Sequence, residues 1–557
     1  MMVLTVARGF RIPQTIVLLV LFVLAAPAIG WSVDEQPPAK RIDPAGISGS
    51  LVLVGGGHIP ADAREQFLKL AGGSKAKIVV IPTARDDADL AQGISSLKMW
   101  EEAKPASAVL LHTRSRDEAD SVAFVEPLHD ATAVWLDDGL VTRLTAVYSK
   151  TAVQRDILRV LQRGGVVGGS AAGAAVLGVG VAFDRDKETP DLVGFEFLPG
   201  PLIEPHFIER KKHSQLPRML EARPELFGLG IDEETAVIVH GRTIDVVGAG
   251  QVTISLHSSA NRPAREITFN DGEQTDLTRW RLAARARRTP PFPAAEPSPP
   301  QVAAGSLVIV GGGGLTAEIV QRFIDLAGGP ESTIVVLPTA NDDPTKVAVR
   351  DGRFLERAGC KHVVTLPQTS LADVSSTEFL AHLKSARGIW FGGGRQWRFL
   401  DAYDQTPAVA AFHEVLQRGG VIGGSSAGAT IQGEYLVRGS PQGNTEMMAE
   451  GYERGLGFLP GVAIDQHFTQ RKRQADLLSV MVAYPQLLGI GLDETTAIIV
   501  QGTTAEVLGK NQAHFYNTRV RTAAEAPECT SLAVGRRYDL VKRQVIEPVT
   551  AREPKEE

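Results

Sequence analysis

Cysteine is almost absent from this chain of 557 residues, which contains only Cys360 and Cys529. Two cysteines cannot build the dense disulfide framework of a small secreted scaffold, and they lack the clustered spacing of a cysteine-ligated metal site. The sequence therefore predicts no metal centre. We interpret both residues as small, buried apolar side chains. A disulfide between them is the alternative.

An excess of positive charge is also missing. The chain has 58 Lys and Arg against 64 Asp and Glu, for a formal net charge of −6 at pH 7. Proteins that bind nucleic acid usually carry a basic patch, so this balance disfavours a nucleic-acid partner. The hydrophobic share of 43% and the charged share of 22% are ordinary for a globular protein. The length exceeds what one hydrophobic core usually supports, so we expect two domains.

Long apolar runs are absent except near the start of the chain. Arg8 and Arg11 precede the apolar run Ile16–Ala26, which is followed by small residues. This order is typical of a secretory signal peptide, and the run is too short for a bilayer, which takes about 20 apolar residues. We predict a signal peptide over residues 1–30, cleaved near residues 28–30, with an uncleaved anchor as the alternative. The mature protein is then expected to be secreted or periplasmic, without membrane attachment.

Much of the sequence occurs twice. Three pairs of matching segments follow in the same order: SLVLVGGG from Ser50 and SLVIVGGG from Ser306, LQRGGVVGGSAAGA from Leu161 and LQRGGVIGGSSAGA from Leu416, GLGIDEETAVIV from Gly228 and GIGLDETTAIIV from Gly489. A repeat of about 250 residues is far longer than a solenoid unit and has the size of a whole domain. The pattern therefore indicates tandem duplication of a domain.

A stretch rich in proline and alanine separates the two copies. It runs from Arg281 to Gly305 and shows no apolar periodicity. Such a composition is typical of a semi-extended linker. We therefore place the first domain at residues 46–280, the linker at 281–303 and the second domain at 304–550.

Within each copy, short apolar runs alternate with segments of helical length. The runs of the second copy are Leu307–Val310, Thr333–Leu337, Ile389–Phe391 and Val421–Ile422. Continuous apolar strands that alternate with helices predict a parallel sheet covered on both faces. The expected fold class is α/β, with two tandem doubly wound parallel-sheet domains. Active sites in such sheets lie at the carboxyl ends of the strands.

The strongest chemical signal is the segment Gly424–Gly428, with sequence GSSAG, directly after an apolar strand. It fits the G-x-S-x-G nucleophile elbow, in which a sharp strand-to-helix turn holds the serine Oγ above the sheet. Small flanking residues are needed because the turn is crowded. The pattern marks Ser426 as the candidate nucleophile. A glycine- and serine-rich turn of purely structural purpose is the alternative.

A serine hydroxyl is a weak nucleophile, so it needs a base that is itself oriented by an acid. The second copy offers His467 in the segment IDQHF and Glu494 in the segment GLDET. Of the histidines in this copy, only His467 lies in a motif that recurs in the other copy. These residues predict a Ser426–His467–Glu494 triad.

Three ordered motifs resemble the cyanophycinase branch of the peptidase S51 family over essentially the whole second domain: SSAGA from Ser425, IDQHFTQRKR from Ile464 and GIGLDETTA from Gly489. The resemblance implies a flavodoxin-like sheet similar to that of class I glutamine amidotransferases. It also implies Ser426 as nucleophile, His467 as general base and Glu494 as the acid that orients the base. Neither a cofactor nor a metal is needed.

The same resemblance implies further site residues. An oxyanion hole would use the backbone N–H groups of Ala427, Gly393 and Gly394, and the substrate pocket would include Gln396, Asp465, Gln466, Arg471 and Arg473. Members of this branch hydrolyse cyanophycin, a polyaspartate that carries arginine on each β-carboxyl group, to β-aspartyl-arginine dipeptides. Arg471 is the candidate cation for the aspartyl carboxylate. Asp476 stands where the family often has another arginine, and this departure leaves the exact polymer open.

The first copy departs from the motif at the decisive position, because Ala171 aligns with Ser426. The other replacements are Val141 for Gln396, Asp137 and Asp138 for Gly392 and Gly393, Glu204 for Asp465, and Pro205 for Gln466. His206 and Glu233 remain, but they have no nucleophile to activate. We expect this degenerate site to be inactive. The first domain would then be either an intramolecular partner in a pseudo-dimer or a module that binds the polymer.

Three other assignments fit these residues less well. An α/β-hydrolase has its acid before its histidine, the reverse of the order here, and a glutamine amidotransferase has cysteine at the elbow. The glycines Gly311–Gly314 lack the G-x-G-x-x-G spacing of a dinucleotide site. Two functional alternatives stay open: a broader exopeptidase for aspartyl or isoaspartyl peptides, and a non-enzymatic polymer-binding protein.

Overall fold

A computed structural model describes residues 41–90, 94–182, 191–211, 215–260, 262–288, 290–518 and 528–547. The predicted signal peptide and its cleavage point lie outside these residues. Within the described ranges, no helix combines the length and the apolar character needed to cross a bilayer.

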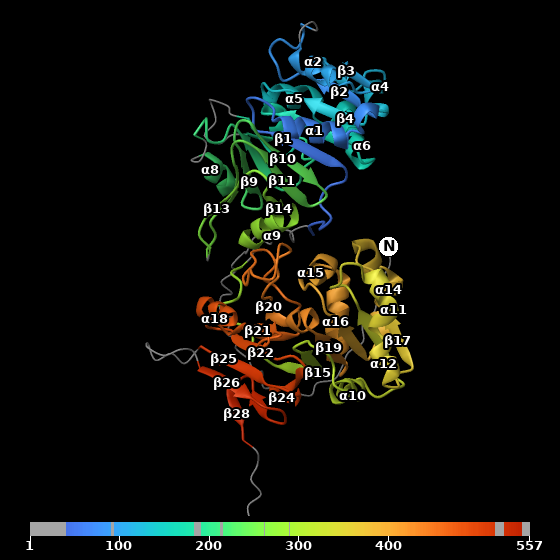
Figure 1. The fold of residues 1–557 in the computed structure, drawn as a ribbon, viewed down its shortest axis with the longest axis vertical. Helices are drawn as coiled ribbons and strands as arrows, with labels where there is room; N and C mark the ends of the chain where they lie inside the picture. The colour runs from blue at the N-terminus through green and yellow to red at the C-terminus, as the bar shows by residue number, and fades with distance from the viewer. Residues whose placement is uncertain are drawn as a thin grey trace, which may run out of the picture. The chain divides into compact units, whose positions relative to one another are not determined.

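The first copy contains a main sheet of eight strands and a second sheet of four (Figure 1). In spatial order the main sheet is β14 (Gln274–Asp276), β11 (Thr243–Gly248), β10 (Thr235–His240), β1 (Ser50–Val54), β5 (Val166–Ser170), β4 (Ala133–Leu136), β2 (Lys77–Ile81) and β3 (Ser107–Leu110). The second sheet is β13 (Arg265–Phe269), β12 (Val252–Leu256), β9 (Phe227–Ile231) and β8 (Pro201–Pro205), and β6 (Gly180–Ala182) pairs with β7 (Asp191–Val193). Its helices are α1 (Ala61–Leu70), α2 (Ser95–Glu102), α3 (Arg116–Ala119), α4 (Glu126–His129), α5 (Val141–Tyr148), α6 (Ala152–Gln162), α7 (Ala172–Ala175), α8 (Gln215–Ala222) and α9 (Leu277–Arg288), with a 3-10 turn η1 (Gly73–Lys75).

The second copy repeats this arrangement. Its main sheet is β17 (His362–Thr365), β16 (Thr333–Leu337), β18 (Gly388–Phe391), β19 (Val421–Ser425), β15 (Val302–Val310), β23 (Thr496–Gly502), β24 (Thr504–Gly509), β27 (Arg537–Asp539) and β28 (Gln544–Ile546). Its second sheet is β20 (Gly433–Tyr435), β21 (Leu459–Gln466), β22 (Leu488–Leu492), β25 (Ala513–Asn517) and β26 (Glu528–Leu532). The helices are α10 (Ala317–Leu326), α11 (Pro344–Asp351), α12 (Arg353–Arg357), α13 (Leu371–Val374), α14 (Thr377–Ser385), α15 (Trp397–Tyr403), α16 (Pro407–Gln417), α17 (Ala427–Thr430) and α18 (Gln474–Ala483).

The predicted parallel strands form only part of each copy. In the second copy β15 to β19 pair in parallel, but β23 joins β15 in the antiparallel sense and opens an antiparallel edge. The second sheet was not predicted, because its strands carry polar motif residues and do not alternate with long helices. It nevertheless provides β21 and β22, the strands that lead into the IDQHF and GLDET motifs.

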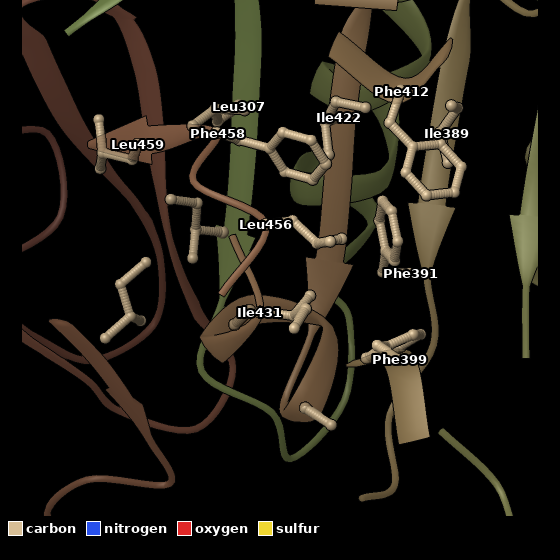
Figure 2. Packing of buried hydrophobic residues seen from close by; sticks show 14 of the residues in the cluster. Leu307, Ile389, Phe391, Phe399, Phe412, Ile422, Ile431, Leu456, Phe458 and Leu459 are labelled. Carbon is tan, nitrogen blue, oxygen red and sulfur yellow. The ribbon is translucent and has the colours of Figure 1, made fainter. Parts of the chain in front are cut away.

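The main sheet of the second copy is covered on both faces, which explains its continuous apolar strands. Along β18, Phe391 packs on Phe412 of α16, with ring centroids 5.2 Å apart, while Trp390 faces the other way onto Phe323 of α10 at 5.1 Å. Figure 2 shows Phe391 and Phe412 in the core next to Ile422 of β19. This rigid layer holds the carboxyl end of β19 in place.

The predicted linker departs from the structure at its start. Helix α9 continues through Arg288, so the extended, proline-rich part begins only after it. The segment LAARARR consists of strong helix formers, and Leu282, Ala283 and Ala284 are buried against the rest of the protein. The prolines from Pro290 onward then prevent the helix from continuing.

The two cysteines are unpaired. Cys360 is buried, as interpreted from the sequence, whereas Cys529 is exposed on β26. The prediction of a buried side chain is therefore wrong for Cys529, because it lies on the outermost strand of the second sheet.

Candidate active site

The segment Gly424–Gly428 forms a strained turn between β19 and α17. Ser426 has φ 57° and ψ −112°, and its N–H donates to Val310 O of β15 at 3.0 Å. A positive φ at a residue with a side chain costs about 1–3 kcal/mol and persists only where the surroundings enforce it. Gly428 is required here, since a Cβ on it would lie 2.0 Å from Phe391 O. The turn therefore fixes Ser426 at the carboxyl end of the sheet.

The three residues predicted as a triad come together at this point. Ser426 Oγ lies 3.0 Å from His467 Nε2, and His467 Nδ1 lies 2.6 Å from Glu494 Oε1. An ionised carboxylate only accepts hydrogen bonds, so Nδ1 carries the proton and Nε2 presents its lone pair to the serine hydroxyl. This is the arrangement in which an imidazole can take the proton of an attacking serine.

His467 directly follows β21 and is held by the turn after β15. Its N–H donates to Gly311 O at 2.8 Å, and it adopts a φ of 51°. Gly312 lies against the imidazole so closely that a Cβ on it would lie 2.3 Å from His467 Cε1. Burial lowers the pKa of His467 below its ordinary value of 6.5, the hydrogen bond to Glu494 opposes this, and the nearby Arg471 adds to the lowering. The ring is therefore neutral at neutral pH.

Glu494 is positioned by two amide side chains that sequence reasoning missed. Its N–H donates to Gln470 Oε1 at 2.9 Å, and Asn511 Nδ2 donates to its carbonyl oxygen at 2.8 Å. Gln470 lies within the IDQHFTQRKR motif, so its place in that motif could have indicated a role at the site. Asn511 could not be predicted from the sequence, because it lies in a turn outside every motif.

The preceding residue, Asp493, holds the loop that carries Glu494 through both of its carboxylate oxygens. Asp493 Oδ1 accepts from Thr469 N at 3.0 Å, and Asp493 Oδ2 lies 3.4 Å from His514 Nε2. Burial alone would lower the pKa of His514, but the Asp493 carboxylate and, after it, the side chain of Cys529 outweigh burial and raise this pKa to about 9. His514 is thus a charged support for the loop that carries Glu494.

Two backbone N–H groups near Ser426 are available for an oxyanion. Within the described residues, neither Gly393 N nor Ala427 N donates to the protein, whereas Gly392 N donates to Leu337 O at 3.0 Å. Gly393 lies next to the nucleophile, since a Cβ on it would lie 3.6 Å from Ser426 Cβ. Gly394 N also donates to no described residue, but the close contacts of Gly394 are with Ala340. Of the three predicted donors, Gly393 and Ala427 are therefore the two that adjoin Ser426.

Two of the predicted pocket residues bond Arg438, which sequence reasoning missed, and a third bonds Asp465 beside it. Gln396 Nε2 donates to the carbonyl oxygen of Arg438 at 2.8 Å, and Asp465 Oδ2 accepts from Arg438 Nη2 at 3.2 Å. Arg473 Nη1 donates to Asp465 Oδ1 at 3.0 Å, and the guanidinium of Arg438 also bonds Asp476. Asp465 has no exposed surface, and its carboxylate is enclosed by two guanidinium groups. These residues therefore hold the strand before His467 in place.

Asp476 stands where the family often has an arginine, and the structure shows what this aspartate contacts. Asp476 is the counter-ion of Arg438, which comes from a different segment. The sequence could not reveal this pair, because the two residues belong to different elements that only the fold brings together.

The remaining two predicted pocket residues differ in exposure. Gln466 is buried, and its Oε1 has no hydrogen-bond partner among the described residues. Arg471 is exposed, and its guanidinium forms no ion pair within the same part of the chain. Arg471 is close enough to His467 to lower the pKa of that ring.

The first copy has the same frame without the nucleophile. Ser170 occupies the register position of Ser425, opposite Val54 of β1, so Ala171 stands at the elbow with φ 46° and ψ −106°. His206 Nδ1 lies 2.6 Å from Glu233 Oε1, as in the second copy. The turn and the histidine–glutamate pair are retained, whereas the attacking hydroxyl is missing and Asp138 stands in sequence where the second copy has Gly393.

Comparison with known proteins agrees with the duplication. The sequence model of peptidase family S51 matches residues 51–247 and again residues 307–508. The chain belongs to peptidase family S51. The first S51 match contains Ala171, His206 and Glu233, and the second contains Ser426, His467 and Glu494. The S51 family consists of peptidases, which are enzymes that hydrolyse peptide bonds.

Several curated proteins are similar to parts of this S51 chain. A cyanophycinase of Geminocystis herdmanii is 32% identical over 220 residues, which cover 38% of this chain and 81% of that protein. A cyanophycinase of Trichormus variabilis is 28% identical over 269 residues, or 45% of this chain and 90% of that protein. Each match spans about one domain-sized copy.

Solved structures of peptidases also align with the chain. A peptidase from an acI-B1 Actinobacterium is 23% identical, with a TM-score of 0.33, over 42% of this chain and 98% of that one. A putative peptidase E protein from Listeria monocytogenes is 19% identical, with a TM-score of 0.30, over 37% of this chain and 99% of that one.

The packing of Gly312 on the imidazole gives a first prediction. Gly312→Ala should displace His467 and lower kcat/KM by about 100-fold, because misplacing a catalytic group by about 1 Å has an effect of this size. Gly359→Ala is the matched control, since Gly359 has φ 99°, close to the 101° of Gly312, but nothing lies within 4 Å of its Cβ position. Equal losses in the two variants would show that backbone strain alone matters.

The charge of Arg471 gives a second prediction, on pH dependence. Protonation of His467 removes the base, so kcat/KM should fall as the pH drops through its pKa, with a midpoint below 6.5. Arg471→Ala removes a positive charge that disfavours protonation, so the midpoint should move to higher pH. Arg471→Lys keeps the charge and should leave the midpoint in place. An unchanged midpoint in Arg471→Ala would contradict the electrostatic coupling.

Proposed function

We propose that the second copy is a serine peptidase with Ser426 as nucleophile, His467 as general base and Glu494 as the orienting acid. The observation that carries this proposal is the continuous chain of hydrogen bonds from Ser426 Oγ through the imidazole to Glu494, built on a strained elbow. A structural turn has no need of a neutral, buried imidazole whose free nitrogen faces a serine hydroxyl.

The reaction follows from this geometry in two stages. His467 Nε2 takes the proton of Ser426 as Oγ attacks the carbonyl carbon of the scissile bond. The N–H groups of Gly393 and Ala427 then stabilise the negative charge on the carbonyl oxygen, and the protonated imidazole gives its proton to the leaving amine. Water next attacks the acyl-enzyme with His467 again as base, which releases the acid and restores the serine.

The proposed substrate is cyanophycin or a related polymer of β-aspartyl-arginine units, which the enzyme would cleave to dipeptides. Two sets of observations support this: several similar proteins are named cyanophycinase, and the groups near the triad suit a substrate of mixed charge. Arg471 is an exposed cation that can bind an aspartyl carboxylate, and Gln466 Oε1 is an acceptor without a partner among the described residues.

The first copy is proposed to be a pseudoenzyme domain. Ala171 carries no nucleophilic atom, and the carboxylate of Asp138 stands in sequence where Gly393 stands in the second copy. A negative charge beside the developing oxyanion would oppose acyl transfer, so both changes act in the same direction.

The first copy is further proposed to support the second as an intramolecular pseudo-dimer. The argument rests on arginines of α9 that bond the segment Arg438–Glu453. Arg287 Nε donates to Glu450 Oε1 at 2.7 Å, both side chains being buried, and Arg279 bonds Gln442 and Glu446. The same segment begins with Arg438, whose guanidinium holds Asp465 near the triad.

The mature protein is proposed to act outside the cytoplasm, as a secreted or periplasmic enzyme. The support is the sequence of residues 1–30, with its basic start and apolar run.

The third prediction tests the reaction and the nucleophile together. The purified protein should release β-aspartyl-arginine from cyanophycin, and Ser426→Ala should lower kcat by about 10⁴-fold or more, because the attacking oxygen is lost. Ser425→Ala is the matched control, since this neighbour ends β19, and it should keep most of the activity.

Other outcomes of this assay select the alternatives. Cleavage of small β-aspartyl or isoaspartyl peptides without release from the polymer would make the protein a broader exopeptidase. Binding of the polymer without any cleavage would make it a polymer-binding protein. Full activity in Ser426→Ala would contradict the assigned nucleophile.

The fourth prediction concerns the supporting role of the first copy. Arg287→Met removes the closest guanidinium from the Glu450 carboxylate, while Arg262 and Arg265 remain at 3.4 and 3.5 Å. Leaving a buried charge with no partner costs about 3–5 kcal/mol, so the loss here should be smaller than that. We expect a lower melting temperature and lower peptidase activity. The adjacent Arg288→Met is the control, because Arg288 Nη1 lies 3.8 Å from Glu225 Oε2, within the first copy. Equal behaviour of the two variants would argue against the pseudo-dimer.

A further inference from the structure

The degenerate site of the first copy is a pocket. A cavity of about 260 Å³ lies over the elbow, and its wall includes Asp138, Ala171, Glu204, His206 and Arg210. It is far larger than the space of about 30 Å³ that one water molecule takes up in the liquid. Loss of the nucleophile has therefore not been accompanied by filling of the site.

One buried nitrogen in this pocket lacks a hydrogen-bond partner. His206 is 5% exposed, and among the described residues nothing bonds its Nε2. Because Nδ1 faces the carboxylate of Glu233 at 2.6 Å and carries the proton, Nε2 is an acceptor. In the second copy the hydroxyl of Ser426 fills this role, but Ala171 has nothing to donate. A buried polar atom that is left unpaired is destabilising, so Nε2 favours a ligand with a donor group.

The backbone that shapes the pocket is kept in its strained form. Ala171 has φ 46° and His206 has φ 51°, close to the values of 57° and 51° at Ser426 and His467. The anchoring bonds are kept too, because Ala171 N donates to Val54 O at 2.9 Å and His206 N donates to Gly55 O at 2.8 Å. The first copy thus has a preformed site, but this site lacks the nucleophile that acyl transfer requires.

The charged side chains in the pocket wall indicate which kind of ligand fits. Asp138 lies in the pocket wall and has one carboxylate oxygen on its neighbour Gly139 N at 2.6 Å. The nearby cation Arg85 is already bonded to both carboxylate oxygens of Asp87, at 2.8 and 2.9 Å. Asp138 therefore offers negative charge to the pocket, and Arg210 in the same wall is an exposed cation.

We propose that this pocket binds, without cleaving it, an arginine or a peptide that ends in arginine. The guanidinium would lie between Asp138 and His206 Nε2, and the carboxylate would lie on Arg210. A guanidinium has five N–H donors in a planar fork, so it can serve a carboxylate and a ring nitrogen at once. This inference depends on the residues of the first copy and holds whether or not the second copy cleaves cyanophycin.

The fifth prediction tests the proposal by calorimetric titration of the full-length Ser426→Ala protein, which excludes turnover. L-arginine should bind, and L-citrulline, its neutral isostere, should bind about tenfold more weakly or worse, because the charge-assisted bond to Asp138 is lost. Asp138→Asn should weaken arginine binding by a similar factor. Asp117→Asn, at an exposed carboxylate of α3 outside the pocket wall, is the control and should leave the affinity unchanged.

Three results would overturn the proposal. They are no binding of L-arginine, equal affinity for arginine and citrulline, and an affinity that is unchanged in Asp138→Asn but lost in Arg471→Ala, which would place the ligand in the second copy. Folding of each variant is checked by its melting temperature and its circular-dichroism spectrum. A protein that fails to cleave cyanophycin but binds arginine through Asp138 would refute the proposed substrate and leave this site standing.

Discussion

The turn after the first strand of each copy is the constraint on which the site depends. In the second copy, Gly311 O accepts from His467 N and Gly312 O accepts from Thr495 N, at 2.8 and 2.7 Å. These two bonds tie the main sheet to the loops that follow β21 and β22. The imidazole and Glu494 follow strands of one sheet and Ser426 follows a strand of the other, so these bonds, together with the apolar core that the two sheets share, fix the distance between them.

The same constraint explains why the first copy kept its geometry after losing its nucleophile. Gly55 O accepts from His206 N, and Gly56 O accepts from Glu234 N, at 2.8 and 3.0 Å. The strained turns are enforced by these main-chain bonds and by close packing, neither of which involves the serine hydroxyl. Replacing Ser by Ala therefore removes chemistry and leaves a shaped cavity. The replacement of glycine by Asp138 then changed the charge of this cavity without changing its frame.

The charged groups around the second site act at two levels. His467 and Glu494 face the nucleophile directly, whereas Arg438, Asp465 and Arg473 form a buried cluster behind the strand that delivers His467. Buried charges are stable only when each is paired, so removing one member of such a cluster exposes the others to an uncompensated cost. The cluster is for this reason a stiff support, and it links the site to the segment that the arginines of α9 hold.

The sequence by itself determined the duplication, the α/β class, the elbow and the three residues that come together at it, because each is written in a local motif or in a period of the chain. It could not determine the second sheet or the exposure of Cys529, since these depend on which segments pair across long distances. The helical start of the linker did have a local signal in the helix formers of LAARARR, but the proline-rich composition that follows it outweighed this signal. Only the tertiary structure brought Arg438 to Asp465 and Asp476, Asn511 to Glu494, and the unpartnered His206 Nε2 into a cavity. Contacts of this kind carry no sequence signal, because the partners lie on separate elements and only packing decides that they meet.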